Sequence, residues 1–297
     1  MLKLQTPVTD QECKVGISYK DRILMMGSCF SENIGRQLAD FGFDICVNPF
    51  GTLYNPVSIF QSLDILSGDR LFSDEDCIQI GAGDERWCSF SHHTSFARST
   101  REEFLADANA ALSSAREFFA GCNKIIITLG TAWCFRNVNT GSIVSNCLKR
   151  PAKEFVRERL APSEITDILC HIAKICSSSE SLRQKDIIFT VSPIRHFKDG
   201  AHGNQISKAS LLVGTEDFLN YAQQSLSNLH TDYFPAYEIV MDELRDYRFY
   251  AEDMCHPSSQ AVDYIRERFL SWALPASEHP VLEENIRNFK RISHKKQ

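Results

Sequence analysis

Short apolar runs alternate with stretches of helical periodicity along most of this chain. The apolar runs predict strands over 22–28, 44–48, 124–129 and 186–192, and the helical spacing predicts helices over 31–41, 56–66, 101–119, 163–177, 204–227 and 258–272. Because strands that alternate with helices pair in parallel and are covered on both faces, this pattern predicts an α/β fold with a central, mostly parallel sheet. Ligands of such sheets bind at the carboxyl ends of the strands, which here carry Cys29, Asn48, Gly130 and Ser192.

Two stretches depart from this alternation. Residues 71–98 lack a regular period and predict an irregular or β-rich insertion. Residues 277–297 predict a polar, solvated tail that contains the cations Lys290, Arg291, Lys295 and Lys296. The chain has 297 residues, of which 43% are hydrophobic, so it can bury a sizeable core. We therefore expect one elaborated domain over 1–297.

The first predicted strand ends in a turn that carries two nucleophilic side chains, Ser28 and Cys29. Four apolar residues lead to Gly27, and a helix is predicted directly after the turn. Amides at a helix N-terminus lower the pKa of a thiol and stabilise an oxyanion, so the position suits acyl transfer by Cys29 or by Ser28. Alternatively, Gly27 only makes the turn, Ser28 or Ser31 caps the helix, and Cys29 is a small buried apolar residue.

Far downstream, Asp253 precedes His256 by three residues, just ahead of the last predicted helix. A carboxylate at this spacing can orient an imidazole and stabilise its charged form while the second ring nitrogen faces a nucleophile. In the alternative interpretation Asp253 makes a turn, His256 is a satisfied polar residue, and Ser258 or Ser259 caps the helix. The motif gains weight from the nucleophile-bearing turn at the first strand.

Two pairs of polar residues lie in predicted loops. Arg195 and His196 follow the strand at 186–192, so they are expected on the rim of the site, where they would hold an anionic or sugar substrate; a solvated surface loop is the alternative. His92 and His93 are expected to be solvent-exposed loop residues, because no Asp, Glu or Cys stands at metal-ligand spacing from them; a second base or a metal ligand is the alternative.

Composition restricts the class of protein. A net charge of −6 without a long basic run argues against a nucleic-acid partner, and no segment is long enough for a membrane span. Residues 1–20 lack the apolar stretch of a signal peptide, so a cytoplasmic protein is expected. The 11 scattered cysteines, without a Cys-x-x-Cys pair, predict reduced thiols rather than disulfides or structural zinc. No nucleotide-binding loop or other cofactor motif is evident, and no cofactor is expected.

Five ordered motifs resemble a known family. The segments GSCFSENIG, NPFGTLYNP, ITLGTAW and SPIRH, followed by Asp-x-x-His, are similar to those of the GSCFA-domain proteins, a largely uncharacterised bacterial group related to the SGNH (GDSL-like) hydrolases. The resemblance runs from about Arg22 to about Phe269. It implies a three-layer, SGNH-hydrolase-like (flavodoxin-like) fold and the esterase, acetylhydrolase or O-acyltransferase chemistry that SGNH enzymes perform with a Ser, a His and an Asp.

The SGNH resemblance also implies roles for individual residues. The nucleophile position falls on Cys29, and Ser28 replaces the Asp that normally precedes the nucleophile. The second SGNH block matches the segment from Asn48 to Gly51, which implies that the Gly51 amide is a donor of the oxyanion hole.

The third SGNH block matches Gly130 and Thr131, but Ala132 stands where the family has an oxyanion-hole Asn. The loss of one such donor costs about a hundredfold or more in rate. Four side chains are candidates to replace it, namely Asn48, Asn55, Asn146 and Thr131.

These observations lead to an expected function. The resemblance implies an esterase or acyl hydrolase that acts on O-acyl substrates, such as O-acetylated carbohydrates, through Cys29 or Ser28 with His256 and Asp253. The alternatives are an O-acyltransferase of carbohydrate metabolism and a non-catalytic binding module on the same fold. The expected partner is a small-molecule or carbohydrate ester, and the sequence leaves the oligomeric state open.

Overall fold

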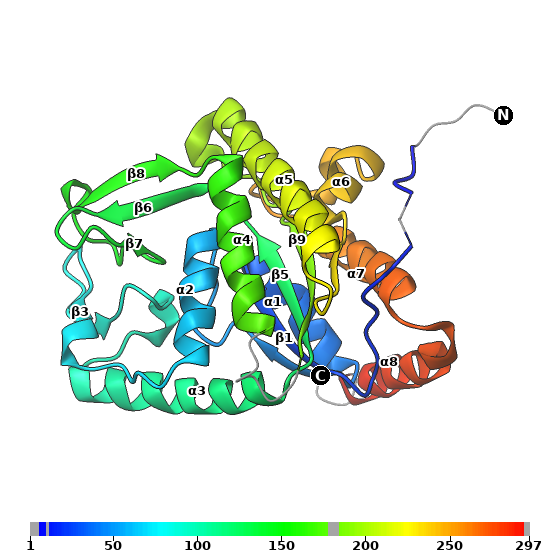
Figure 1. Ribbon diagram of the computed structural model, residues 1–297, viewed down its shortest axis with the longest axis horizontal. Coiled ribbons are helices and arrows are strands. Elements are labelled where there is room, and N and C mark those ends of the chain that lie inside the picture. The colour runs from blue at the N-terminus through cyan, green and yellow to red at the C-terminus, as the bar shows by residue number, and fades with distance from the viewer. Residues whose placement is uncertain (1–5, 10–11, 178–183, 294–297) are drawn as a thin grey trace.

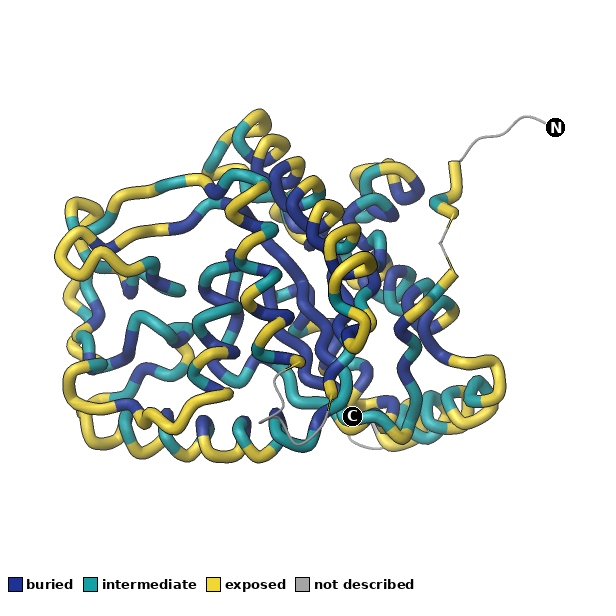
Figure 2. The backbone as a smooth tube through the Cα atoms, viewed as in Figure 1, coloured by how far each residue is buried: buried dark blue, intermediate teal, exposed yellow. Residues whose placement is uncertain are grey.

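Figure 1 shows the computed structural model of the protein, which describes residues 6–9, 12–177 and 184–293. A twisted central sheet separates two layers of helices. Figure 2 shows that the buried backbone is concentrated in this sheet and in the helix faces turned towards it. The predicted α/β fold with a central parallel sheet is therefore confirmed. No helix among the described residues has the length and apolar composition needed to cross a membrane.

The central sheet has five parallel strands in the order β10-β9-β5-β1-β2. These strands are β1 (Arg22–Gly27), β2 (Asp44–Val47), β5 (Lys124–Leu129), β9 (Asp186–Val191) and β10 (Thr231–Tyr233). The chain moves from β1 to β2 on one side and later returns to β5 on the other side of β1. The strand order therefore reverses at β1, and such a reversal opens a crevice at the carboxyl ends of the neighbouring strands.

Helices cover both faces of the sheet. The helices are α1 (Cys29–Asp40), α2 (Pro56–Ser67), α3 (Arg101–Gly121), α4 (Pro162–Ser177), α5 (Gly200–Ser225), α6 (Ala236–Glu238), α7 (Ser259–Ala273) and α8 (His279–Ser293). Successive residues of a strand point to opposite faces, so Leu24 and Met26 pack with α2, α3, α4 and α5. Ile23 and Met25 pack with α1 and α7 on the other face.

The long predicted elements match the observed ones to within a few residues, whereas short strands were missed. The sequence pattern did not predict β10 or the three-stranded antiparallel sheet made of β6 (Trp133–Asn137), β7 (Ile143–Val144) and β8 (Phe155–Arg159). Charged residues such as Arg136 and Glu158 lie within β6 and β8, so the apolar run of each strand is only two or three residues long. Tertiary pairing rather than local hydrophobicity defines them.

Residues 71–98, which do not follow the alternation of strands and helices, form a compact insertion. It contains two short 3₁₀ turns, at Asp74–Asp76 and Thr94–Phe96, and a two-stranded antiparallel ribbon of β3 (Ile78–Gln79) and β4 (Trp87–Cys88). Trp87 also forms an antiparallel bridge with Arg98, which joins the end of the insertion to its ribbon just before α3.

The C-terminal region corrects the expectation of a polar tail. Residues 279–293 form α8, and Leu282, Ile286 and Phe289 recur at helical spacing on the side that packs against the core cluster of α1 and α7. Asn285 Nδ2 donates to Phe41 O at 2.9 Å and ties this helix to the end of α1. Because α8 has few apolar residues and many charged ones, its composition alone did not indicate an amphipathic helix.

Candidate active site

The turn between β1 and α1 has a geometry that only glycine fits. Gly27 has φ 142°, and a Cβ there would lie 2.3 Å from Thr128 O on the neighbouring strand. Ser28 follows as the N-cap of α1: its Oγ accepts from the Phe30 amide at 3.3 Å, and its hydroxyl donates to Ser192 Oγ at 3.2 Å. Ser28 is fully buried, so its hydroxyl joins two strand ends and does not face solvent.

Cys29 is the first residue of α1 and is partly exposed, unlike Ser28. Burial raises the pKa of its thiol, and the carboxylates of Glu32 and Asp253 raise it further, while the amides of Cys29 and Phe30 lower it. Desolvation outweighs the helix N-terminus, so the sequence-based expectation of a lowered pKa is wrong. The resting thiol is protonated at neutral pH and needs a base to become a nucleophile.

Asp253 and His256 form the pair that the sequence predicted to be in contact. Asp253 Oδ2 lies 2.5 Å from His256 Nδ1, and Asp253 Oδ1 accepts from the amides of Cys255 and His256, both at 2.9 Å. These two amides, with the imidazole, lower the pKa of the Asp253 carboxyl to about 2. The carboxylate thus fixes Nδ1 as the protonated nitrogen and leaves Nε2 as the free base.

The loop that carries this pair is joined to the end of β9. Arg195 N donates to Cys255 O at 3.0 Å, and Ala251 N donates to His256 O at 2.7 Å. Asp253 is close enough to Cys29 to shift its pKa, which brings the two halves of the predicted site into one electrostatic environment. Among the described residues, no hydrogen bond joins Cys29 Sγ to His256.

The segment after β2 crosses the carboxyl ends of β1 and β5. Gly27 N donates to Asn48 Oδ1 at 2.9 Å, whereas Asn48 Nδ2 is buried and has no hydrogen-bond partner among the described residues. Gly51 N donates to Asn48 O at 2.7 Å, so the amide expected to be an oxyanion donor is already occupied. Gly51 has φ 82°, and a Cβ there would lie 2.3 Å from His93 Cβ, which explains why glycine stands at this position.

The block around Gly130 is held by hydrogen bonds of its own. The amides of Gly130 and Thr131 both donate to Tyr54 O, at 2.9 and 2.8 Å. Ser207 Oγ accepts from the Ala132 amide at 2.8 Å and lies 2.9 Å from Thr131 Oγ1. These contacts consolidate the block, and the Thr131 hydroxyl is engaged within it.

Of the four candidates for the missing donor, Asn48 stands apart. Asn55 Oδ1 caps α2 by accepting from Ser58 N at 2.9 Å, and Asn146 Oδ1 accepts from Leu148 N at 2.8 Å in a turn. Thr131 Oγ1 accepts from Trp133 N at 3.1 Å. Among these described side chains, only Asn48 holds a buried donor that lacks an acceptor.

His196 lies between the Gly130 block and His256. Burial lowers its pKa to about 4, and the charges of Lys208, His256 and Arg157 lower it further, so the ring is neutral at pH 7. Its amide donates to Asn204 Oδ1 at 2.9 Å. Among the described residues its Nε2 has no partner, so the ring brings an unsatisfied polar atom to this edge of the sheet.

Lys208 of α5 is a residue of this region that the sequence pattern did not reveal. Its side chain is 1% exposed, and Nζ donates to Gly130 O at 2.6 Å and to Ser192 O at 2.7 Å. Burial lowers its pKa to about 7. No carboxylate among the described residues forms an ion pair with it. A signal was present in the sequence: Lys208 lies at helical spacing from the buried Leu211, Thr215 and Phe218.

His92 corrects another expectation. It is fully buried, with Nδ1 2.7 Å from Ser89 Oγ, and its ring packs against an aromatic cluster made of Phe50, Phe72, Phe96 and Phe104. Burial lowers the pKa of His92 to about 4. His93 is partly exposed and contacts Ser95 Oγ at 3.0 Å. Among the described residues, no group of three or more His, Cys, Asp or Glu side chains could hold a metal ion.

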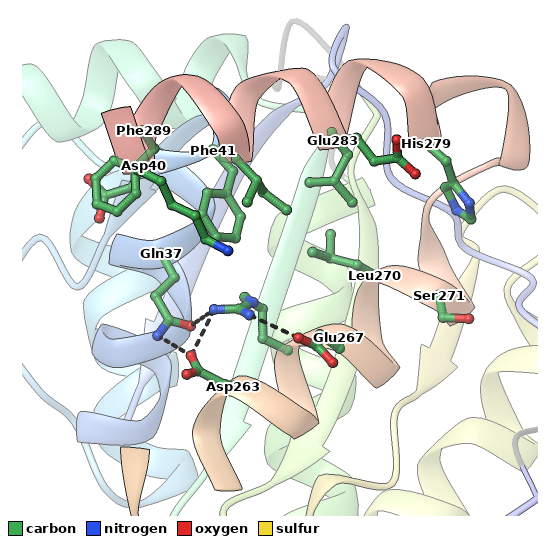
Figure 3. A pocket seen from close by; sticks show the side chains of 14 residues that line it. Gln37, Asp40, Phe41, Asp263, Glu267, Leu270, Ser271, His279, Glu283 and Phe289 are labelled. Carbon is green, nitrogen blue, oxygen red and sulfur yellow. Dashed lines mark hydrogen bonds and ion pairs between the residues drawn. The ribbon is translucent and has the colours of Figure 1, made fainter. Parts of the chain in front are cut away.

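A large cavity lies elsewhere, between α1, α7 and α8. Figure 3 shows this cavity from close by. Its volume is about 650 Å³, and Arg266 Nη1 donates to Gln37 Oε1 at 3.0 Å and to Asp263 Oδ1 at 2.8 Å. None of the described residues that line it belongs to the candidate site. The catalytic interpretation therefore rests on the chemistry at the strand ends and not on cavity size.

Comparison with known proteins agrees with the extent of the motifs. The GSCFA family model matches residues 22–269, which begin at β1 and end within α7. No match was found among curated proteins.

Proposed function

The chain belongs to the GSCFA family, and we propose that it is an SGNH-like acyl hydrolase in which Cys29, His256 and Asp253 cleave oxygen esters. The bond between Asp253 Oδ2 and His256 Nδ1 carries this proposal, because the carboxylate is itself held by two amides and leaves Nε2 as the base. Cys29 supports it as the nucleophile, since it is partly exposed at a helix N-terminus while Ser28 is buried and engaged.

In the proposed reaction, His256 Nε2 takes the proton from Cys29 Sγ as the sulfur attacks the ester carbonyl carbon. The carbonyl π electrons move to oxygen and form a tetrahedral oxyanion, which the Cys29 amide and the unpaired Asn48 Nδ2 stabilise. The oxyanion collapses, the alkoxide leaves with the proton from His256, and a thioester remains on Cys29. His256 then deprotonates a water molecule that attacks the thioester carbonyl carbon. The C–S bond breaks, the acyl group leaves as a carboxylic acid, and Cys29 Sγ takes the proton from His256.

General-base activation fits this site better than a preformed thiolate. The raised pKa of Cys29 and the carboxylates of Glu32 and Asp253 disfavour a resting negative charge on sulfur. Proton transfer in concert with attack avoids that charge, and Asp253 stabilises the imidazolium that forms.

The proposed substrate is a small polar ester, with O-acetylated carbohydrate as the leading class. The buried Nε2 of His196, which has no hydrogen-bond partner in the described part of the chain, supports this proposal, because a neutral imidazole nitrogen can donate or accept a hydrogen bond with a sugar hydroxyl. If an alcohol replaced water in the second step, the same residues would perform O-acyl transfer. A binding module without chemistry is the alternative favoured by Ala132, which brings no side-chain donor to the third block.

The first prediction separates Cys29 from Ser28. Cys29→Ala should abolish hydrolysis of 4-nitrophenyl acetate, because no nucleophile remains, while Ser28→Ala should retain most of it after allowance for the lost N-cap, which costs about 1 kcal/mol of stability. The nitrophenolate release rate and mass spectrometry of an acylated peptide that contains residue 29 are the measurements. An inactive Ser28→Ala protein with normal thermal unfolding, beside an active Cys29→Ala protein, would make Ser28 the nucleophile.

A further inference from the structure

Arg195 is held rigidly beside the Asp253–His256 loop. Its Nη1 donates to Met254 O at 3.3 Å, and its guanidinium carbon lies 4.1 Å from the ring centroid of Phe197 and 5.2 Å from that of Tyr250. Two aromatic contacts and one carbonyl fix the plane of the group, so little side-chain entropy is left to lose when it binds a ligand.

Within the described part of the chain, the charge of Arg195 has no counter-ion. Among the described residues no carboxylate lies within ion-pair distance of it, whereas Arg157 is paired with the buried side chain of Asp199. The nearby Asp253 carboxylate is committed to His256 and to two amides. Most of the five N–H donors of Arg195 are therefore unused, and the full positive charge remains available at the site.

The guanidinium is not needed to hold the loop. The backbone bonds Arg195 N to Cys255 O at 3.0 Å, Ala251 N to His256 O at 2.7 Å and Ser258 N to Phe249 O at 2.8 Å already secure it. A single side-chain bond of 3.3 Å adds little to these three. A rigid, unpaired guanidinium is instead the group that binds carboxylate or phosphate oxygens in a bidentate manner.

We propose that Arg195 binds an anionic group of the substrate, a carboxylate or a phosphate, so that the preferred esters carry a negative charge close to the acyl bond. The identity of the anion as part of a substrate rests on the proposed function, but the anion-binding property of Arg195 does not depend on turnover. Attraction to the anion adds to transition-state binding and raises kcat/KM for charged esters over neutral ones.

The test compares two alkylating reagents at Cys29. Iodoacetate is anionic and iodoacetamide is neutral, so the ratio of their rates at residue 29, measured by peptide mass spectrometry, reports the electrostatic potential at the thiol without any catalysis. Arg195→Gln should lower this ratio by roughly threefold or more, because the positive charge beside the Asp253–His256 loop is lost. Arg195→Lys, which keeps the charge, should retain most of it. Arg248→Gln is the matched control, since Arg248 is 71% exposed and paired with Asp246.

The wild-type protein provides a check that needs no variant. Raising ionic strength from about 0.02 to 0.5 M should lower the iodoacetate rate far more than the iodoacetamide rate, because salt screens an exposed charge. An unchanged ratio in folded Arg195→Gln protein, or the same fall in Arg248→Gln, would overturn the proposal.

Ester and inhibitor pairs identify the anion. The mono-4-nitrophenyl ester of succinate should exceed 4-nitrophenyl butyrate in kcat/KM, and Arg195→Gln should remove this preference mainly through KM. Stronger competition by phenyl phosphate than by benzoate would indicate a phosphate, and the reverse a carboxylate. If the wild-type protein cleaves no ester but the alkylation ratio responds as expected, the proposed hydrolase function fails while the anion site stands.

Discussion

Ser28 and Cys29 are adjacent in the chain, yet the turn gives their side chains opposite environments. The hydroxyl of Ser28 is buried between Phe30 N and Ser192 Oγ, while Cys29 is partly exposed at the start of α1 and packs beside a core cluster. The capping role and the candidate nucleophilic role therefore belong to different residues. The turn therefore contains both a helix cap, at Ser28, and a candidate nucleophile, at Cys29.

The second prediction concerns Asp253, which in the proposed mechanism keeps the proton of His256 on Nδ1. Asp253→Asn keeps an oxygen for the Cys255 and His256 amides, but its Nδ2 donates to His256 Nδ1 and forces the proton onto Nε2. Turnover of 4-nitrophenyl acetate should fall by roughly 10²- to 10⁴-fold with thermal unfolding nearly unchanged. Steady-state rates beside a melting curve provide the measurement, and full activity in this variant would exclude an orienting role.

At the scale of elements, α5 connects the ends of two central strands. Lys208 Nζ donates to Gly130 O after β5 and to Ser192 O after β9, and Ser192 in turn accepts from Ser28 at the start of α1. The parallel strands pair along their length, but their carboxyl ends diverge into separate loops. A buried ammonium that bonds both carbonyls keeps these loops in register, although burying it unpaired is costly.

The third prediction tests that cost. Because burial lowers the pKa of Lys208 to about 7 from 10.5, the unfolded chain binds more protons between these values, and this residue makes stability rise with pH over that window. Lys208→Met removes this contribution, whose slope is about 1.4 kcal/mol per pH unit. Urea unfolding of both proteins at pH 7, 8 and 9 measures the difference in slope.

The same variant separates stability from function. We expect Lys208→Met to fold at pH 7 with stability near or above that of the wild-type protein, because a buried charge is replaced by an apolar chain of similar volume. Ester hydrolysis should nevertheless fall by roughly tenfold, since the loops at Gly130 and Ser192 lose their common donor. Unchanged hydrolysis would show that the lysine has no part in positioning the site.

At the scale of the whole molecule, the insertion at 71–98 contacts the segment after β2, which contributes to the candidate site. His93 N donates to Phe50 O at 2.9 Å, and the His93 side chain lies against Gly51 in the segment that crosses β1. His92, next to it, is enclosed with Phe50, Phe72, Phe96 and Phe104. The packing of this insertion is therefore coupled to the geometry of the candidate active site.

The fourth prediction follows from the buried imidazole. The pKa of His92 is lowered from 6.5 to about 4, so the unfolded chain takes up a proton first, and stability is lost as pH falls from 6.5 towards 4. A shift of this size corresponds to about 3 kcal/mol at the acid end. His92→Asn should be less sensitive to acid by about that amount, as measured by urea unfolding at pH 7, 5.5 and 4.5. His202→Asn, at an exposed position, is the control and should leave the acid dependence as in the wild-type protein.

Much of the architecture could be predicted because the spacing of apolar residues, which determines the buried face of an element, can be read from neighbouring positions in the sequence. The strands Lys124–Leu129 and Asp186–Val191 each contain three consecutive apolar residues, and the Asp253–His256 contact joins residues only three apart. In contrast, β6 and β7 are short, β8 contains three consecutive charged residues, and α8 has few apolar positions, so these elements do not stand out from the surrounding sequence. Elements of this kind form because a partner segment buries one of their faces.

The amino-acid sequence by itself determined the alternating α/β order, the glycine turn before Cys29 and the orientation of His256 by Asp253, because each depends on neighbours along the chain. Only the tertiary structure decided that Ser28 is engaged with Ser192, 164 residues away, and that Lys208 joins Gly130 to Ser192 across 78 residues and 16 residues of chain. It also decided that the Gly51 amide is occupied and that burial raises the pKa of Cys29 despite its helix N-terminus. Hydrogen-bond partners and desolvation are set by segments that folding brings together, and a one-dimensional pattern does not contain those distances.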